Sequence, residues 1–199
     1  KSINNTFSYS EEMAGRVKST ENITHVVPRL ESFALGAHKD KTKGVMVVGI
    51  EPEKETELTH LAEKVRAGQY LQAGDKGVMV ASRLANYLEI SVGDTLVMLG
   101  QGYHGASAAG KYPVRAILKF PAPDLDNKIV FMNLSAAQDM YSAYGMLTSL
   151  ALDVAEREKL PQTITHLRQT LDTEKYEMFS WRESLKELDQ QIQSDSASG

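Results

Sequence analysis

Residues 112–120 read Tyr-Pro-Val-Arg-Ala-Ile-Leu-Lys-Phe, and this stretch decides how the middle of the chain is interpreted. Apolar or aromatic side chains stand at every second position, at Tyr112, Val114, Ala116, Leu118 and Phe120. Because successive side chains of a strand point to opposite faces, this spacing puts all five on one face. The pattern predicts a half-buried antiparallel strand, which ends where the prolines at 121 and 123 follow.

Residues 1–67 are expected to contain two strands and two helices. Residues 23–35 and 45–50 are rich in Val, Leu and Phe and predict strands, with the first bent near Pro28. A turn-forming segment is expected between them at residues 36–44. Leucine, alanine and valine then recur with helical spacing, which predicts a helix over residues 55–67. Residues 1–20 are polar with helix-compatible spacing, so we expect a helix there too.

Short elements surround the decisive strand, and longer ones return near the end. The expected strands are at 77–80, 95–99, 128–134, 147–154 and 176–181. A short helix is expected at 82–88, and Ser135 with Gln138 predicts a capping box for a second helix that runs to about residue 144. Pro161 marks the start of a third helix. An amphipathic helix with apolar residues at 185, 188 and 192 is expected over 182–193.

These elements predict an α+β fold in which one subdomain is inserted into another. Residues 20–67 and 146–185 are expected to form a discontinuous, split α/β sandwich subdomain. Residues 68–145 are expected to form the inserted, mostly antiparallel β-rich subdomain, with a small core of its own around Leu84, Leu88, Val97, Val114, Leu118 and Phe131. Residues 1–199 together make a single domain.

The composition excludes several classes of protein. The 22 basic and 26 acidic residues give a net charge of −4 with no cluster of Lys and Arg, which argues against nucleic-acid binding. The chain contains no cysteine, so disulfides, thiolate metal sites and cysteine nucleophiles are excluded. No apolar run approaches the roughly 20 residues that span a bilayer. The chain opens at Lys1 rather than Met, which suggests either processing or a piece cut from something longer.

A glycine-rich segment, Gly100–Lys111, carries two motifs that suggest nucleotide binding. Residues 100–105 match the dinucleotide pattern G-x-G-x-x-G, and residues 105–111 match the start of a phosphate-binding loop. Both motifs function only where the loop opens a helix, because the helix N-terminus holds the phosphate. Here the expected strand at 112–120 follows directly, and Tyr112 stands where the loop needs Ser or Thr. A flexible hairpin tip is the better interpretation, and an enzyme that uses this loop as a phosphate site is the weakest hypothesis.

No arrangement of side chains predicts catalysis, a cofactor or a metal. The sequence has five isolated histidines, without the spacing of a metal site: His25, His38, His60, His104 and His166. Ser107 lacks the glycine pattern of a nucleophile elbow. We therefore expect no catalytic, cofactor-binding or metal-binding residue. Tyr103 and His104, on the glycine-rich loop, are the candidates for contact with a partner protein, because an aromatic pair on a loop is typical of recognition surfaces.

Several stretches resemble the MacB-like periplasmic core domain of ABC-transporter permeases. The first is Gly-Ile-Glu-Pro-Glu at residues 49–53, ahead of the helix that contains Leu61 and Ala62. The second runs from Val-Ala-Ser-Arg-Leu-Ala at 80–85 to Val-Gly-Asp-Thr-Leu at 92–96. Leu-Ser-Ala-Ala-Gln at 134–138 resembles the next strand-to-helix junction. Residues 102–105 and 110–114 look like the lipoprotein-releasing branch of this FtsX-like family.

This resemblance implies a non-catalytic domain that faces the periplasm from the bacterial inner membrane. Family members lie between membrane helices, form dimers and pair with a cytosolic ATPase subunit, and the periplasmic domain transmits the ATP-driven motion to export or to lipoprotein release. It implies that residues 1–20 and 182–193 lie at the same end of the molecule, toward the membrane. A free-standing periplasmic binding or adaptor protein is the alternative hypothesis. The transported substrate is not predicted.

Overall fold

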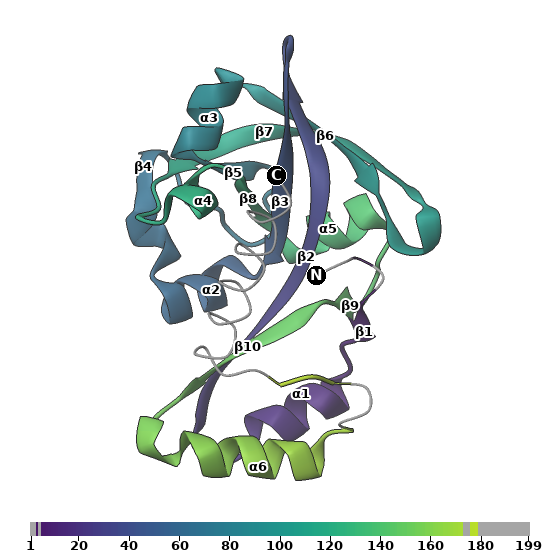
Figure 1. The fold of residues 1–199 in the computed structure, drawn as a ribbon, viewed down its shortest axis with the longest axis vertical. Coiled ribbons are helices and arrows are strands. Elements are labelled where there is room, and N and C mark those ends of the chain that lie inside the picture. The colour runs from purple at the N-terminus through teal and green to yellow at the C-terminus, as the bar shows by residue number, and fades with distance from the viewer. Residues whose placement is uncertain (1–2, 4, 173–175, 179–199) are drawn as a thin grey trace, which may run out of the picture.

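The computed structural model describes residue 3, residues 5–172 and residues 176–178 (Figure 1). The strands are β1 (Phe7–Ser8), β2 (Ile23–His38), β3 (Lys41–Ile50), β4 (Val65–Gly68), β5 (Val78–Ala81), β6 (Thr95–Gln101), β7 (Ser107–Leu118), β8 (Ile129–Asn133), β9 (Met146–Leu147) and β10 (Ser149–Val154). The helices are α1 (Glu11–Lys18), α2 (Pro52–Thr59), α3 (Ser82–Leu88), α4 (Pro123–Asp126), α5 (Leu134–Tyr141) and α6 (Leu160–Thr170). Helices and a mixed sheet alternate along the chain, so the predicted α+β fold is confirmed.

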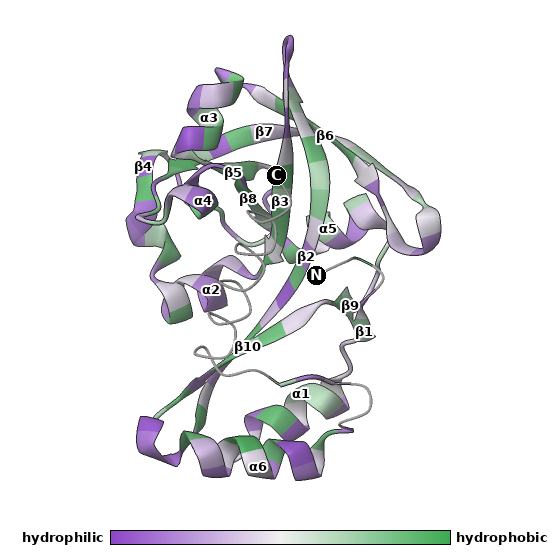
Figure 2. Cartoon of the chain, viewed as in Figure 1, coloured by the Kyte–Doolittle hydropathy of each residue, from purple (hydrophilic) through white to green (hydrophobic). Residues whose placement is uncertain are grey.

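One large sheet organises the described residues. Its strand order is β10-β2-β3-β8-β5-β7-β4, and β6 pairs with both β2 and β7. Most pairs are antiparallel, while β3–β8 and β5–β7 are parallel. In Figure 1, β2 runs from the part that contains α1, α6 and β10 into the part that contains all the other large elements. Figure 2 shows that the β2–β3 hairpin is hydrophilic at its tip and more hydrophobic toward the middle of the molecule.

The strand expected at residues 112–120 lies inside this sheet, as part of β7. Val114, Ala116 and Leu118 are buried, and Phe120 just beyond the strand is buried too. The predicted burial is confirmed, but the expected single face is wrong. Val114 packs in a different core cluster from Ala116, Leu118 and Phe120, because the pairing of β7 with β5 shifts its register between Val114 and Ala116. The pairing is richer than a hairpin, because β7 is antiparallel to β4 and β6 but parallel to β5.

The turn expected at residues 36–44 is much shorter than predicted. β2 continues to His38 and β3 begins at Lys41, so Lys39 and Asp40 alone make the turn. Lys39 has a φ of 53°, the left-handed conformation that two-residue hairpins need. The polar residues at 38–43 resemble a loop in the sequence. Most of them lie in the strands of the hairpin, because its tip is exposed and its strands need no apolar side chains there.

The helix expected over residues 55–67 is wrong in its extent. α2 starts early, with Pro52 in its first turn, and ends at Thr59 because His60 adopts a φ of 54°. Leu61 then packs into the core from a short 3₁₀ turn, and Val65 pairs with Leu118 as part of β4. The sheet edge and the core outweigh the helical spacing of these residues.

The capping box expected at Ser135 and Gln138 is also wrong. α5 begins two residues earlier than that box requires, at Leu134 with Asn133 as its N-cap residue, and no side chain caps it. Gln138 instead donates a hydrogen bond from Nε2 to the carbonyl of Met146, at 3.0 Å. Its amide therefore ties the end of α5 to β9 rather than closing the start of the helix.

The core has two clusters, one on each face of the sheet. The first contains Leu84, Leu88 and Val114 together with Leu30 and Val45. The second contains Leu118 and Phe131 together with residues of β3 and with Leu61 from the 3₁₀ turn that follows α2. The prediction that residues 68–145 have a separate core is wrong, because both clusters draw on chain segments outside that range. The subdomain boundaries themselves stay a prediction.

The two ends of the chain agree only in part with expectation. α1 confirms a helix within residues 1–20, but Phe7–Ser8 forms a short strand with β9. α6 starts with Pro161 in its first turn, as predicted. Residues 176–178 have no regular structure, while the rest of the expected strand and the expected helix at 182–193 lie outside the described residues. No helix in the described ranges is long and apolar enough to cross a membrane.

Candidate functional site

The glycine-rich segment is mostly strand rather than a flexible loop. Gly100 pairs with Ala108 and Gln101 with Ser107, so only residues 102–106 connect β6 to β7. Gly100 allows this pairing to run beside β2, because a Cβ there would come within 3.0 Å of the Phe33 carbonyl oxygen. The small residues allow the strands to pack closely. The sequence analysis had interpreted the same residues as a flexible tip.

The hairpin tip is closed by its own backbone and rests on α5. The amide of Gly102 donates to the carbonyl of Ala106 at 2.6 Å, and the amide of Ala106 donates to Tyr103 at 3.2 Å. Gly102 is buried, and a Cβ at this position would lie 2.6 Å from the carbonyl oxygen of Tyr141. Only glycine allows this approach, so the tip has a fixed position on the end of α5.

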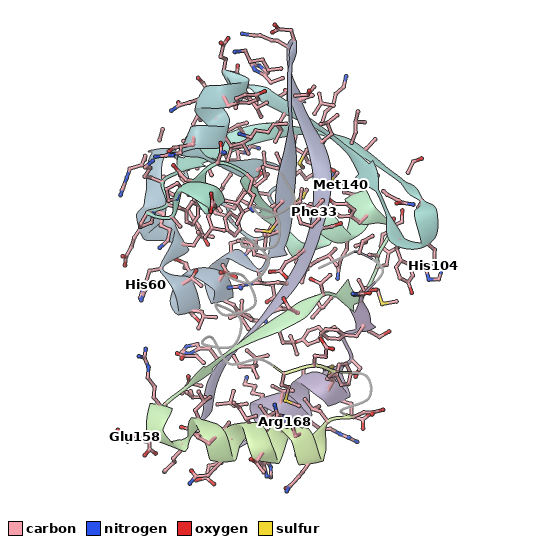
Figure 3. The ribbon with its side chains drawn as sticks, viewed as in Figure 1. Phe33, His60, His104, Met140, Glu158 and Arg168 are labelled. Atoms are coloured by element: carbon pink, nitrogen blue, oxygen red, sulfur yellow. The ribbon has the colours of Figure 1, made fainter. Side chains whose placement is uncertain are left out.

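Tyr103 and His104 are adjacent at the tip but face different surroundings. Tyr103 is half-buried and packs against the first core cluster. His104 is exposed at the outer bend of the hairpin, with a φ of 52° (Figure 3). Their rings meet edge to face with centroids 4.0 Å apart. Of the two residues expected to contact a partner, His104 is therefore exposed, and Tyr103 packs between its imidazole and the core.

Tyr141 joins the tip to β2, a role that the sequence analysis missed. Its hydroxyl donates to the Phe33 carbonyl at 3.2 Å, and its side chain is fully buried. Burial raises the pKa of this phenol well above the ordinary value for tyrosine. Tyr141 lies one helical turn after Ala137 and beside Met140, and this apolar face of α5 was the signal in the sequence.

An exposed apolar face of the sheet adjoins the hairpin. Phe33 is 58% exposed, Leu35 42% and Leu99 48%, and Leu35 stands directly opposite Leu99 across β2 and β6. Gly44 is the partner of Leu35 on β3, and Ala109 is the partner of Leu99 on β7, so the face is flat around these side chains. Alternation of buried and exposed apolar residues in β2 hid this face from sequence interpretation.

The motifs for nucleotide binding lie in the β6–β7 hairpin, at the ends of its two strands and in the connection between them. Residues 107–111 of the phosphate-loop pattern belong to β7, and the residues after them continue the same strand. The sequence argued against nucleotide binding because a strand rather than a helix was expected after these motifs, and that strand is present. Within residues 3, 5–172 and 176–178, no three His, Cys, Asp or Glu side chains gather in a way that could hold a metal ion.

Comparison with known proteins places this fold. No known family model matches the chain. The lipoprotein-releasing system transmembrane protein LolC of Xylella fastidiosa is 30% identical over 79 residues, which is 39% of this chain and 19% of LolC. The chain therefore matches about a fifth of the length of this curated relative.

Three solved structures share the fold at low sequence identity. The extracellular domain of the noncanonic ABC-type transporter YknZ from Gram-positive bacteria has a TM-score of 0.60 at 12% identity, over 80% of this chain and 79% of that one. The periplasmic region of MacB from Actinobacillus actinomycetemcomitans also has a TM-score of 0.60, at 11% identity, over 85% and 76% of the two chains. A domain of a putative permease from Porphyromonas gingivalis gives 0.50 at 10% identity, over 79% and 70%.

These matches confirm the fold that the sequence motifs resembled. The YknZ structure is an extracellular domain and the MacB structure is a periplasmic region. Each aligns over more than three quarters of this chain. The chain has the fold of the MacB-like extracytoplasmic domain of ABC-transporter permeases.

Proposed function

We propose that this chain is the periplasmic domain of an ABC-transporter permease of the bacterial inner membrane, and that it acts mechanically rather than as an enzyme. The observation that carries this proposal is the fold shared with the MacB and YknZ domains over at least 80% of this chain. The similarity to a segment of LolC supports the same kind of protein.

In this proposal the domain transmits motion generated elsewhere. A cytosolic ATPase subunit binds the parent permease, the parent is embedded in the membrane and dimeric, and ATP-driven conformational change reaches the periplasm through this domain. The outcome is export or lipoprotein release. A continuous sheet in which β2 pairs with β10 at one end and with β3 and β6 at the other suits such a role, because tightly packed interiors transmit displacement.

The gene sequence on either side of the chain tests this proposal. A permease requires about 20 apolar residues before Lys1 and again after Gly199. Purification of the full-length protein from membranes should then bring an ATPase subunit with it. Flanks without apolar segments, together with purification from the periplasm, would instead identify a free-standing binding or adaptor protein.

The tip of the β6–β7 hairpin is the proposed contact surface for a periplasmic protein. His104 is exposed at the bend, and Tyr103 and Gly102 fix its position against the core. An exposed side chain on a fixed backbone loses less entropy when it is bound than one on a mobile loop, which favours recognition.

A matched pair of histidines tests this contact. His104 and His60 have φ values of 52° and 54°, and both are exposed, but Figure 3 shows them on opposite sides of the molecule. His104→Ala should reduce transport by the intact permease and capture of a periplasmic partner, while His60→Ala should leave both unchanged. Equal results for the two variants would leave the hairpin as a plain connector.

A further inference from the structure

β2 belongs to two parts of the molecule at once. Its first residues pair with β10, from Ile23 to Arg29, beside α1 and α6 (Figure 1). Its later residues pair with β3 from Arg29 to His38, and with β6 from Leu35 to Ala37. Arg29 is therefore the residue at which β2 passes from the lower part of the molecule, which contains α1, α6 and β10, to the upper sheet, by which we mean the part of the same sheet formed by β3, β4, β5, β6, β7 and β8.

The backbone around Arg29 is held on both sides. Arg29 lies opposite Ser149 of β10 and opposite Ile50 of β3. Its carbonyl accepts hydrogen bonds from the amide and the hydroxyl of Thr148, at 3.0 and 3.3 Å. The same hydroxyl accepts from the amide of Glu31 at 2.7 Å. Thr148 thus fixes the point where β9 and β10 meet β2.

The side chain of Arg29 continues this junction to α2. Its Nε donates to Glu55 Oε2 at 2.8 Å and its Nη2 donates to Oε1 at 2.7 Å, a two-point contact between planar groups. The Glu55 side chain is 3% exposed, and Thr59 donates a third hydrogen bond to it at 3.0 Å.

The position of this pair matters more than its energy. A buried ion pair adds little net stability over well-packed apolar side chains, because both charges lose their hydration. Its two parallel hydrogen bonds are directional, however, and apolar contacts are not. An ion pair at the point where one strand changes partners therefore restricts the angle between the two parts.

We propose that the Arg29–Glu55 pair is a lock that holds the lower part and the upper sheet as one rigid body. A displacement at α1 and α6 is then carried along β2 to β6 and to the hairpin tip instead of being absorbed as bending at Arg29. This role rests on the proposed function, in which the domain transmits motion. The lock itself is a property of the isolated chain and is measured there.

Distance measurements between two spin labels test the lock. The chain has no cysteine, so Gln169→Cys on α6 and Asn86→Cys on α3, both exposed, label the two parts selectively. In the double variant Arg29→Met/Glu55→Leu, apolar side chains replace the pair and retain packing. Glu89→Gln is the matched control, because it removes the exposed Lys41–Glu89 pair, whose separation is 2.7 Å.

The lock predicts a narrow distance distribution that widens only when the pair is removed. The width at half height should at least double in the double variant and stay unchanged in the control. Arg29→Lys, which keeps the charge but loses the two-point contact, should give an intermediate width and serves as a second variant if the first does not fold. A width equal to that of the wild type in the folded variants would overturn the lock. That result leaves the proposed function intact, because the flanking gene sequence tests it separately.

Discussion

Lys119 and Asp126 form an ion pair of 2.6 Å in which the carboxylate is fully buried and the ammonium group reaches the surface. The hydroxyl of Ser82 and the amide of Phe120 donate two further hydrogen bonds to Asp126, at 3.0 and 2.9 Å. One carboxylate therefore joins the start of α3 to the end of β7 and to α4. Burial alone would raise the pKa of Asp126, but these three donors outweigh it and lower the pKa.

Asp126→Asn should destabilise the protein by about 2–3 kcal/mol at neutral pH, because the amide cannot satisfy three donors. The effect should depend on pH. A lowered pKa in the folded state stabilises the fold above the ordinary aspartate pKa of about 3.9, and this contribution is lost as the pH falls through the folded-state pKa. Urea unfolding at pH 7, 5 and 3.5 measures it. The difference between wild type and variant should shrink at pH 3.5, and a constant difference would contradict the account.

Leu118→Ala should cost about 2–5 kcal/mol, since the side chain is fully buried and its removal leaves a cavity. Leu99→Ala is the control: Leu99 is 48% exposed on the neighbouring strand, and its loss should change stability by no more than about 0.5 kcal/mol. Thermal unfolding of both variants provides the comparison. Similar melting temperatures would mean that the register of β7 is shifted by one residue.

Gly102→Ala should destabilise the hairpin, because the added Cβ would lie 2.6 Å from the Tyr141 carbonyl oxygen and 3.1 Å from that of Ala106. We expect a loss of about 1–3 kcal/mol, with faster amide hydrogen exchange confined to residues 102–106. Gly44→Ala is the matched control, because nothing lies within 4 Å of a Cβ there. Equal effects at the two glycines would show that the tip moves freely on α5.

His104→Gly should stabilise the chain, because His104 has a φ of 52° and glycine adopts this conformation without strain. Part of the gain is offset by the greater freedom of glycine in the unfolded chain, so we expect about 0.5–1 kcal/mol. His60→Gly should behave alike, since its φ is 54°. Thermal unfolding checks both, and a lower melting temperature in both would show that the imidazoles contribute contacts that outweigh the strain.

Local pattern by itself determined the α+β class and the position of several elements. The helix at Ser82–Leu88 agrees with the prediction to the residue, and the alternation of Ala116, Leu118 and Phe120 identified side chains that share one core cluster. Both depend on which side chains a single element hides from water, and that information lies within a few neighbouring residues. The stretches that resemble permease domains led to the fold that the solved structures share.

Contacts between distant segments decided the rest. Val65 has helical spacing after Leu58 and Leu61, yet it lies in a strand because Leu118, 53 positions later, offers a place at the sheet edge. Gly102 reads as flexible in the sequence, but it is the residue that lets the hairpin tip rest on Tyr141. Arg29 and Glu55 are ordinary charged residues until β2 and α2 bring them within 2.7 Å. Only the tertiary structure could decide these features, because the free energy that fixes them comes from partners far away in the chain.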